Sequence, residues 1–314
     1  MSALVSICIP TYKQTLYLKR CLDSVVNQDY SRVEIIISDD SPDDAVKLFL
    51  DKEFPNLKYH YHKNTPSLGT PRNWNAAIQR AKGDYIKILH HDDFFTQSHS
   101  LSMMVNEISN TQSDFLFCQT DVWYTNKNTH RIQSVSDKQF RLMKEKPELL
   151  FYKNIIGAPS VILHKNKKEY KYDENFKWLV DVDFYLNALF LKATWCYIDK
   201  PLISTMHDVE GQITGAVLND KEIQIREHIL LFNKIKPRIV NLKGAAQFFD
   251  ILFFKYQVKN FAELYAITPE AENNHAFYEE IIAGLPKFRF LKNFRNRFFE
   301  SRYNNYIFKF EPYL

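Results

Sequence analysis

Apolar and polar residues alternate in blocks along the first third of the chain. Short apolar runs have the length and β-branched content of buried strands, and they cover residues 5–10, 33–38, 57–61 and 85–89. Segments whose apolar residues recur at helical spacing lie between them, at residues 16–26, 43–54 and 73–81. Strands that alternate with helices predict a largely parallel sheet with right-handed crossovers.

The pattern changes further along the chain. After residue 98 it predicts a helix to residue 108, a strand at 115–118, a polar loop at 125–137 and a helix at 184–193. From residue 221 onward it is helical and rich in aromatic residues. We therefore expect an α/β domain over residues 1–219 and a helical, aromatic and basic region over residues 220–314.

Composition narrows the class of protein. The 314 residues are 45% hydrophobic, without a long apolar run or a basic leader, which predicts a soluble, cytoplasmic protein. The four cysteines are scattered and form no C-x-x-C pair, which disfavours a zinc site or a disulfide framework. None of the seven glycines belongs to a G-x-G-x-x-G or P-loop motif, so a nicotinamide enzyme or P-loop NTPase is disfavoured.

The fourth apolar run ends in four polar residues, His90-His91-Asp92-Asp93. Adjacent carboxylates at the end of a buried strand would lie at the carboxyl edge of the sheet, where open α/β sheets bind ligands. Their hard oxygen atoms suit Mg²⁺ or Mn²⁺. The alternative is that Asp92 and Asp93 only cap the next helix, since aspartate is a preferred N-cap residue.

The first two strands also end in polar residues, at Pro10-Thr11-Tyr12 and Asp39-Asp40-Ser41. All strands of a parallel sheet end at the same edge, so a nucleotide laid across it would meet an aromatic ring, a carboxylate and a metal together. Each cluster taken alone has a simpler interpretation as turn chemistry. Their joint position favours a binding site.

Together these motifs resemble family 2 of the inverting nucleotide-sugar glycosyltransferases, which have the GT-A fold. The matching segments keep the family's order and spacing and lie at residues 5–12, 34–41, 64–73, 81–86 and 90–93. The resemblance covers residues 3–100 well and extends weakly to about 215. It implies an α/β fold with a GT-A-type, mostly parallel sheet flanked by helices, and we add a helical C-terminal extension.

The resemblance implies a nucleotide site at the ends of the first strands. In it, Tyr12 stacks on uracil, Asp39 accepts the imide N–H of the base, and Arg72 lies near the base and phosphates. The alternatives are an ordinary strand-end aromatic residue and two surface charges. The full set of nucleotide candidates is Pro10, Thr11, Tyr12, Asp39, Asp40, Arg72 and His91.

The implied metal is Mn²⁺ or Mg²⁺, bound by Asp92. Many family members have Asp-x-Asp-Asp at this motif, whereas this chain has His90 in place of the first aspartate. His90 and Asp93 are therefore expected to support the site. The segment 207–214 resembles the family's mobile segment, whose histidine approaches the diphosphate or the metal, so His207 is the second metal candidate. Its alternative interpretation is an incidental surface histidine.

An inverting transfer also needs a carboxylate base on the acceptor side of the sugar. The segment 178–185 resembles the family's Glu-Asp segment, with Val180 in place of the glutamate and Asp181 in the position of the base. Asp181 has an alternative interpretation as a first-turn charge on a helix. Asp183, a supporting residue, has one as the N-cap of that helix.

Cations and aromatic residues interleave at residues 287–299. This pattern suits an anionic membrane surface, and the alternative is an amphipathic helix that packs on the catalytic domain. Nucleic acid is disfavoured, because no known binding motif accompanies the segment.

These observations predict a metal-dependent hexosyl- or N-acetylhexosaminyltransferase that uses a UDP-linked donor. The expected acceptor is a glycan or a lipid-linked glycan in bacterial surface polysaccharide or lipooligosaccharide synthesis, at the inner face of the cell membrane. One alternative is a catalytically silent partner protein that binds nucleotide sugars or glycans. A sugar-phosphate nucleotidyltransferase is disfavoured, because the first strand is not followed by a glycine-rich phosphate loop.

Overall fold

The computed structural model describes residues 2–209, 212, 215, 217–239 and 242–285. The chain forms two compact units. Unit 1 consists of Met1–Glu145 and Ile155–Gln212, and unit 2 of Lys146–Asn154 and Ile213–Leu314. The functional division at residue 219 stays a prediction.

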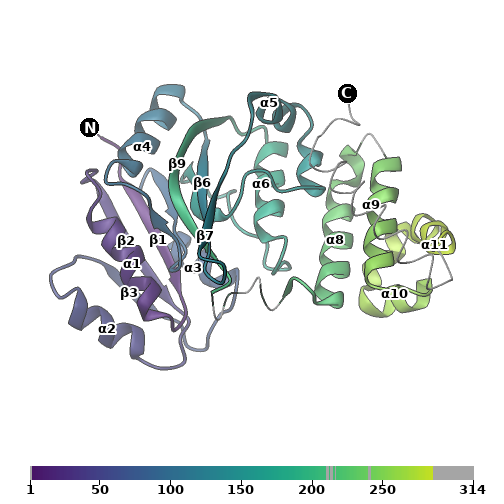
Figure 1. The fold of residues 1–314 in the computed structure, drawn as a ribbon, viewed down its shortest axis with the longest axis horizontal. Coiled ribbons are helices and arrows are strands. Elements are labelled where there is room, and N and C mark those ends of the chain that lie inside the picture. The colour runs from purple at the N-terminus through teal and green to yellow at the C-terminus, as the bar shows by residue number, and fades with distance from the viewer. Residues whose placement is uncertain (1, 210–211, 213–214, 216, 240–241, 286–314) are drawn as a thin grey trace. The chain divides into compact units, whose positions relative to one another are not determined.

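Unit 1 is built on a nine-stranded sheet with the strand order β3-β2-β1-β4-β8-β6-β9-β5, in which β7 pairs with β6. Its first half contains the strands β1 (Val5–Thr11), β2 (Val33–Asp39), β3 (His60–Lys63) and β4 (Tyr85–Ile88). These four strands are parallel. The helices that connect them are α1 (Thr15–Val26), α2 (Ala45–Glu53) and α3 (Arg72–Gln79), and Figure 1 shows α1 and α2 beside β1, β2 and β3.

The second half of the sheet mixes strand directions. Its strands are β5 (Phe94–Phe95), β6 (Phe115–Tyr124), β7 (Thr129–Gln133), β8 (Ile162–Lys165) and β9 (Trp195–His207). Strand β8 is antiparallel to both β4 and β6, so β6 runs in the direction of β4, and β9 is parallel to β6. The remaining elements of the unit are α4 (Ser100–Thr111), α5 (Asp137–Glu145), η2 (Pro159–Val161) and α6 (Val180–Phe190).

The buried positions of β1 explain why the first half of the sheet could be predicted from the sequence. Every residue of β1 is buried, so its side chains are apolar or small on both faces, as expected for an interior parallel strand. Gly83 allows β4 to begin close to β1, because a Cβ atom at this position would lie 2.6 Å from Ser6 Oγ. The fold class and the strands β1, β2 and β4 are confirmed.

Three local predictions are wrong. The third strand lies at His60–Lys63 rather than 57–61, because its pairing with β2 begins only at Ile36. The polar loop at 125–137 contains β7, whose mostly exposed residues lack the apolar alternation that marks a half-buried strand. Helix α6 begins at Val180 rather than at 184, and its N-cap is Leu179, so Asp183 is not the N-cap.

Unit 2 is helical from Lys221, as the pattern predicts. Its elements are η1 (Pro147–Phe151), α8 (Lys221–Ile235), η3 (Lys236–Arg238), α9 (Leu242–Lys255), α10 (Phe261–Ile267), η4 (Pro269–Asn274) and α11 (His275–Ala283). Aromatic residues, among them Phe232, Phe249 and Tyr278, pack together in its core. None of the helices described here is long and apolar enough to cross a membrane. The segment 287–299 lies outside the described residues.

Candidate functional site

Six strands of unit 1 end at one edge of the sheet, because β1 to β4, β6 and β9 all run in the same direction. This edge carries polar residues at or just after the strand ends. They are Thr11, Asp39, Asn64, His90 to Asp93, and His207. The arrangement is the one in which open α/β sheets bind ligands.

Asp39, the candidate reader of the base, is fully buried at the end of β2. One of its carboxylate oxygens accepts a hydrogen bond from the backbone N–H of Ser41 at 2.8 Å, and the other accepts one from the hydroxyl of Tyr61 at 2.7 Å. Burial, followed by this bond to Asp39, raises the pKa of Tyr61 well above its ordinary value. The Lys63 ammonium lies 3.8 Å from the carboxylate. The carboxylate is therefore held in one orientation.

Asp40 is also buried, and it holds the loop that follows β3. Its oxygens accept hydrogen bonds from the backbone N–H groups of Leu68 at 3.1 Å and Gly69 at 2.7 Å, and from the Asn64 amide at 2.8 Å. Gly69 has a φ of +72°, which favours glycine. These bonds engage both oxygens, so the contacts of Asp40 are those of a residue that shapes the loop.

The other nucleotide candidates differ in exposure. Thr11 is buried, and its hydroxyl has no hydrogen-bond partner among the described residues, whereas Tyr12 is 45% exposed. The His91 Nδ1 atom lies 3.4 Å from the carbonyl oxygen of Pro10. Arg72 is the first residue of α3 and is bound through its Nε to Glu174 at 3.0 Å, in an exposed ion pair. Thr11, Tyr12 and His91 therefore lie around the end of β1, whereas Arg72 lies at the start of α3.

Three residues of the polar motif form one cluster. One ligand atom each from His90, Asp92 and Asp93 lie within 4.8 Å of one another. The Nε2 atom of His90 is buried and has no hydrogen-bond partner in the described part of the chain. Two carboxylates and an imidazole with an unused nitrogen fit a Mn²⁺ ion, and the carboxylates alone fit Mg²⁺.

Two of the three groups in this cluster have shifted pKa values. Burial, and then the neighbouring Asp92, raise the pKa of Asp93 well above its ordinary value. Burial lowers the pKa of His90 to about 4. Asp93 is the buried member of the three, and the charge of the buried Lys87 opposes part of its shift. A further positive charge is favoured beside Asp92 and Asp93, because like charges at this distance repel.

Two residues far from the motif in sequence hold this cluster. The hydroxyl of Ser160 accepts a hydrogen bond from the His90 backbone N–H at 3.0 Å and donates one to Asp93. The side-chain amide of Gln212 donates to Asp92 at 2.7 Å. Gln212 belongs to the segment 207–214 that resembles the family's mobile segment, whereas no local pattern identifies Ser160.

His207 is the last residue of β9, and its ring lies 5.4 Å from that of Tyr124. It is not a member of the three-residue cluster. Burial lowers the pKa of His207, while the charges of Asp208 and, more weakly, Asp92 act in the opposite direction. Of the segment that follows, residues 210–211 and 213–214 lie outside the described residues.

Asp181 lies in the first turn of α6, partly exposed, and accepts a hydrogen bond from the Val182 backbone N–H at 2.8 Å. Asp183 is buried in the same helix. Burial raises the pKa of Tyr172, and the charge of Asp181 raises it further. The Tyr172 ring stacks on Phe184 of the same helix. Tyr172 is in turn packed against Trp74, which contacts His90.

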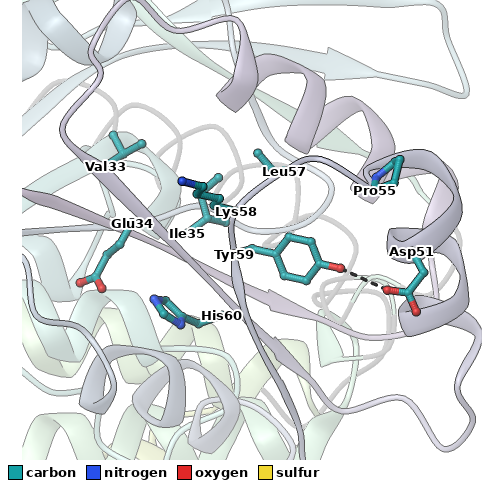
Figure 2. A pocket seen from close by; sticks show the side chains of 9 residues that line it. All are labelled: Val33, Glu34, Ile35, Asp51, Pro55, Leu57, Lys58, Tyr59 and His60. Carbon is teal, nitrogen blue, oxygen red and sulfur yellow. Dashed lines mark hydrogen bonds between the residues drawn. The ribbon is translucent and has the colours of Figure 1, made fainter.

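A cavity of about 680 Å³ lies elsewhere, at the amino end of β2. Figure 2 shows Val33, Glu34 and Ile35 of β2 on one side of it and Tyr59 bonded to Asp51 on the other. Strand β2 begins at this end, whereas Asp39 ends it. The cavity is therefore at the edge opposite to the polar cluster.

Known proteins resemble this chain in sequence and in fold. A sequence model of the family described as "Glycosyl transferase family 2" matches residues 6–165. An uncharacterized glycosyltransferase of Rickettsia typhi is 28% identical over 81% of this chain and 80% of its own length.

Two solved structures share the fold. S. aureus TarS (residues 1–349) in complex with UDP-GlcNAc has a TM-score of 0.58 at 18% identity, covering 88% of this chain and 79% of that one. The mannosyltransferase PcManGT of Pyrobaculum calidifontis, in complex with GDP-Man and Mn²⁺, has a TM-score of 0.53 at 14% identity, covering 88% and 76%. These likenesses confirm the GT-A-type fold.

Proposed function

The chain belongs to glycosyl transferase family 2, and on this premise we propose that it is an inverting enzyme that transfers a hexose or N-acetylhexosamine from a UDP-linked donor. The observation that carries the proposal is the cluster of His90, Asp92 and Asp93 on the sheet edge where Asp39 is held. The two features supply partners for the diphosphate and for the base of one nucleotide.

The chain's own residues have distinct roles in donor binding. Asp39 accepts the imide N–H of uracil, while Tyr12 and the unpaired hydroxyl of Thr11 line the base with Pro10. Asp40 keeps the neighbouring loop in place. His91 and Arg72 are assigned to the phosphate side.

The proposed metal site consists of Asp92, Asp93 and His90, with His207 at the end of β9 as a further candidate ligand. When bound there, Mn²⁺ or Mg²⁺ neutralises the charge that develops on the departing nucleoside diphosphate. PcManGT is in complex with Mn²⁺, which supports the choice of ion.

Asp181 is the base in this proposal. It takes the proton from the acceptor hydroxyl while that oxygen attacks the anomeric carbon from the side opposite the diphosphate, so the configuration inverts in a single displacement. Asp183 supports α6 from within. General-base assistance contributes on the order of 10²- to 10⁴-fold in rate.

The acceptor is a glycan or lipid-linked glycan of the bacterial surface, and the reaction takes place at the inner face of the cell membrane. The cations and aromatic residues at 287–299 support this location by their composition. A chain that ends at residue 285 should sediment less with anionic liposomes than the full chain. Equal sedimentation of the two would contradict membrane docking.

A screen of nucleotide sugars tests the proposed function. The protein is incubated with UDP-, GDP- and dTDP-sugars and Mn²⁺, and release of the nucleoside diphosphate is followed by chromatography. Slow hydrolysis of a UDP-sugar that stops with EDTA is the expected result. Binding without any turnover, with or without candidate acceptors, would favour the alternative of a catalytically silent partner protein.

A further inference from the structure

The proposed reaction fixes where the donor sugar must lie. The diphosphate is held at the metal cluster, and the base attacks from the opposite side of the anomeric carbon. The pyranose ring must therefore occupy the space between His90 and Asp181. The inference below rests on the proposed function and asks which side chains border that space.

Trp74 lies against His90, at one border of this space. The centre of its ring system lies 4.5 Å from that of His90 and 5.1 Å from that of Tyr172, with the latter pair edge to face. His90 belongs to the metal cluster, and Tyr172 packs on α6, the helix whose first turn contains Asp181. The two aromatic rings thus connect the metal cluster to the helix that carries the candidate base.

This connection is fixed by bonds on both sides. The side chain of Asn75 accepts from the Tyr172 backbone N–H at 3.0 Å and donates to the Tyr172 carbonyl at 2.9 Å. The Tyr172 ring stacks on Phe184, three residues after Asp181 in α6, with ring centres 4.2 Å apart. Helices α3 and α6 are therefore joined through one aromatic layer.

The two rings differ in exposure. Tyr172 is buried, whereas Trp74 is only partly buried, so of this pair Trp74 offers more surface to a ligand. An indole presents a wide apolar face, and the C–H face of a pyranose is the part of a sugar that such a surface accepts.

We propose that the indole of Trp74 forms the floor of the donor-sugar subsite, packing against the apolar face of the pyranose and selecting among UDP-sugars. Tyr172 acts as a positioning residue, because it holds the indole from behind and aligns it with α6. Selection arises because sugars that differ at one hydroxyl place a polar or an apolar group on this surface.

The test compares binding of UDP with binding of UDP-glucose, UDP-galactose and UDP-N-acetylglucosamine, by calorimetry with Mn²⁺. Trp74→Ala should bind UDP within about twofold of wild type, while its affinity for the UDP-sugar that wild type prefers falls about fivefold or more. Tyr59→Ala is the control, because Tyr59 lies beside Asp51 at the opposite edge of the sheet and should change neither value.

Equal affinities of wild type and Trp74→Ala for all three sugars would overturn the proposal, as would a parallel loss of UDP binding. If Trp74→Ala does not fold, transferred NOEs between indole protons and the sugar ring of the preferred UDP-sugar are measured in wild type and in Trp74→Phe. NOEs between indole protons and the sugar that are present in wild type and lost in Trp74→Phe support the proposed role of Trp74. NOEs that persist in the variant, or that wild type does not show, overturn it. A wild type that binds neither UDP nor any UDP-sugar would refute the proposed function itself.

Discussion

The nucleotide end and the metal end of the polar sheet edge differ in how their charged groups are held. At the nucleotide end, the carboxylates of Asp39 and Asp40 are buried, and their hydrogen bonds are made within the protein. At the metal end, two carboxylates crowd together, and a buried nitrogen of His90 has no hydrogen-bond partner among the described residues.

The nucleotide end is therefore preorganised, whereas the metal end depends on its ligand. A buried carboxylate with satisfied bonds stabilises the fold and is held in one orientation before a ligand arrives. Two crowded carboxylates repel each other, even though each accepts a hydrogen bond from the protein, and this costs stability until a cation relieves it. We therefore expect substitutions at the metal end to affect ligand binding, and substitutions at the nucleotide end to affect folding as well.

Removal of the metal-binding carboxylate should have the largest effect. Asp92→Ala should weaken Mn²⁺-dependent UDP binding by at least about a hundredfold, because the ion loses its central ligand. Titration calorimetry measures this loss. Asp199→Ala, which removes a carboxylate bonded to Gln119 at the other end of β9, is the control and should bind as wild type does. Unchanged Mn²⁺-dependent affinity in Asp92→Ala would refute the metal assignment.

The base should matter for turnover and not for binding. Asp181→Asn should keep its affinity for the donor and lose about a hundredfold or more in kcat, because an amide cannot accept the acceptor's proton. Asp183→Asn, a change of the buried neighbour in the same helix, is the matched variant. If Asp183→Asn is the inactive one and Asp181→Asn turns over normally, the base has been assigned to the wrong carboxylate.

The expected difference in folding stability between the two ends can be tested by replacing one aspartate at each. Asp40→Ala leaves the backbone N–H groups of Leu68 and Gly69 without their acceptor, and should lower the free energy of unfolding by about 3 kcal/mol. Asp92→Ala removes the acceptor of the Gln212 amide but also relieves the repulsion with Asp93, so it should lower the free energy of unfolding by less than about 1 kcal/mol. Urea denaturation followed by circular dichroism compares them. A larger loss in Asp92→Ala than in Asp40→Ala would reverse the comparison.

Acid should lower the stability of the sheet through a residue outside the metal cluster. Burial lowers the pKa of His164 in β8 from 6.5 to about 4. The unfolded chain then binds a proton that the folded one does not, so stability is retained above pH 6.5 and falls as the pH drops from 6.5 toward 4. The full loss is roughly 3 kcal/mol.

His164→Phe keeps the ring stacked on Phe115 and removes the titrating group. The decrease in melting temperature between pH 6.5 and pH 5 should therefore be smaller in this variant than in wild type. Equal decreases would show that other groups carry the acid sensitivity.

The sequence reveals the first half of the fold because its signals are local. The apolar runs of β1, β2 and β4 and the polar residues that follow them are adjacent in the chain, so period and turn chemistry suffice. Strand β7 and the start of α6 were missed, because exposed residues of a strand and acidic residues in a first helical turn resemble a loop.

The supporting residues of the site could not be found in this way. Ser160 is 70 residues from His90, and Tyr172 is 97 residues from Asn75. Such pairs are joined only by the folded sheet. Trp74 stood beside a motif residue, yet its contact with His90 depends on how α3 packs at the sheet edge. Tertiary contacts of this kind leave no periodic signal in the sequence.

The central claim is that the nucleotide end is ready for its ligand while the metal end is completed by a cation. Melting temperatures of the wild type with UDP, with Mn²⁺ and with both test it most directly, because a ligand raises stability according to its affinity for the folded state. We predict that UDP and Mn²⁺ together raise the melting temperature by more than the sum of their separate effects. A shift by UDP that is the same in Mn²⁺ and in EDTA would contradict the account.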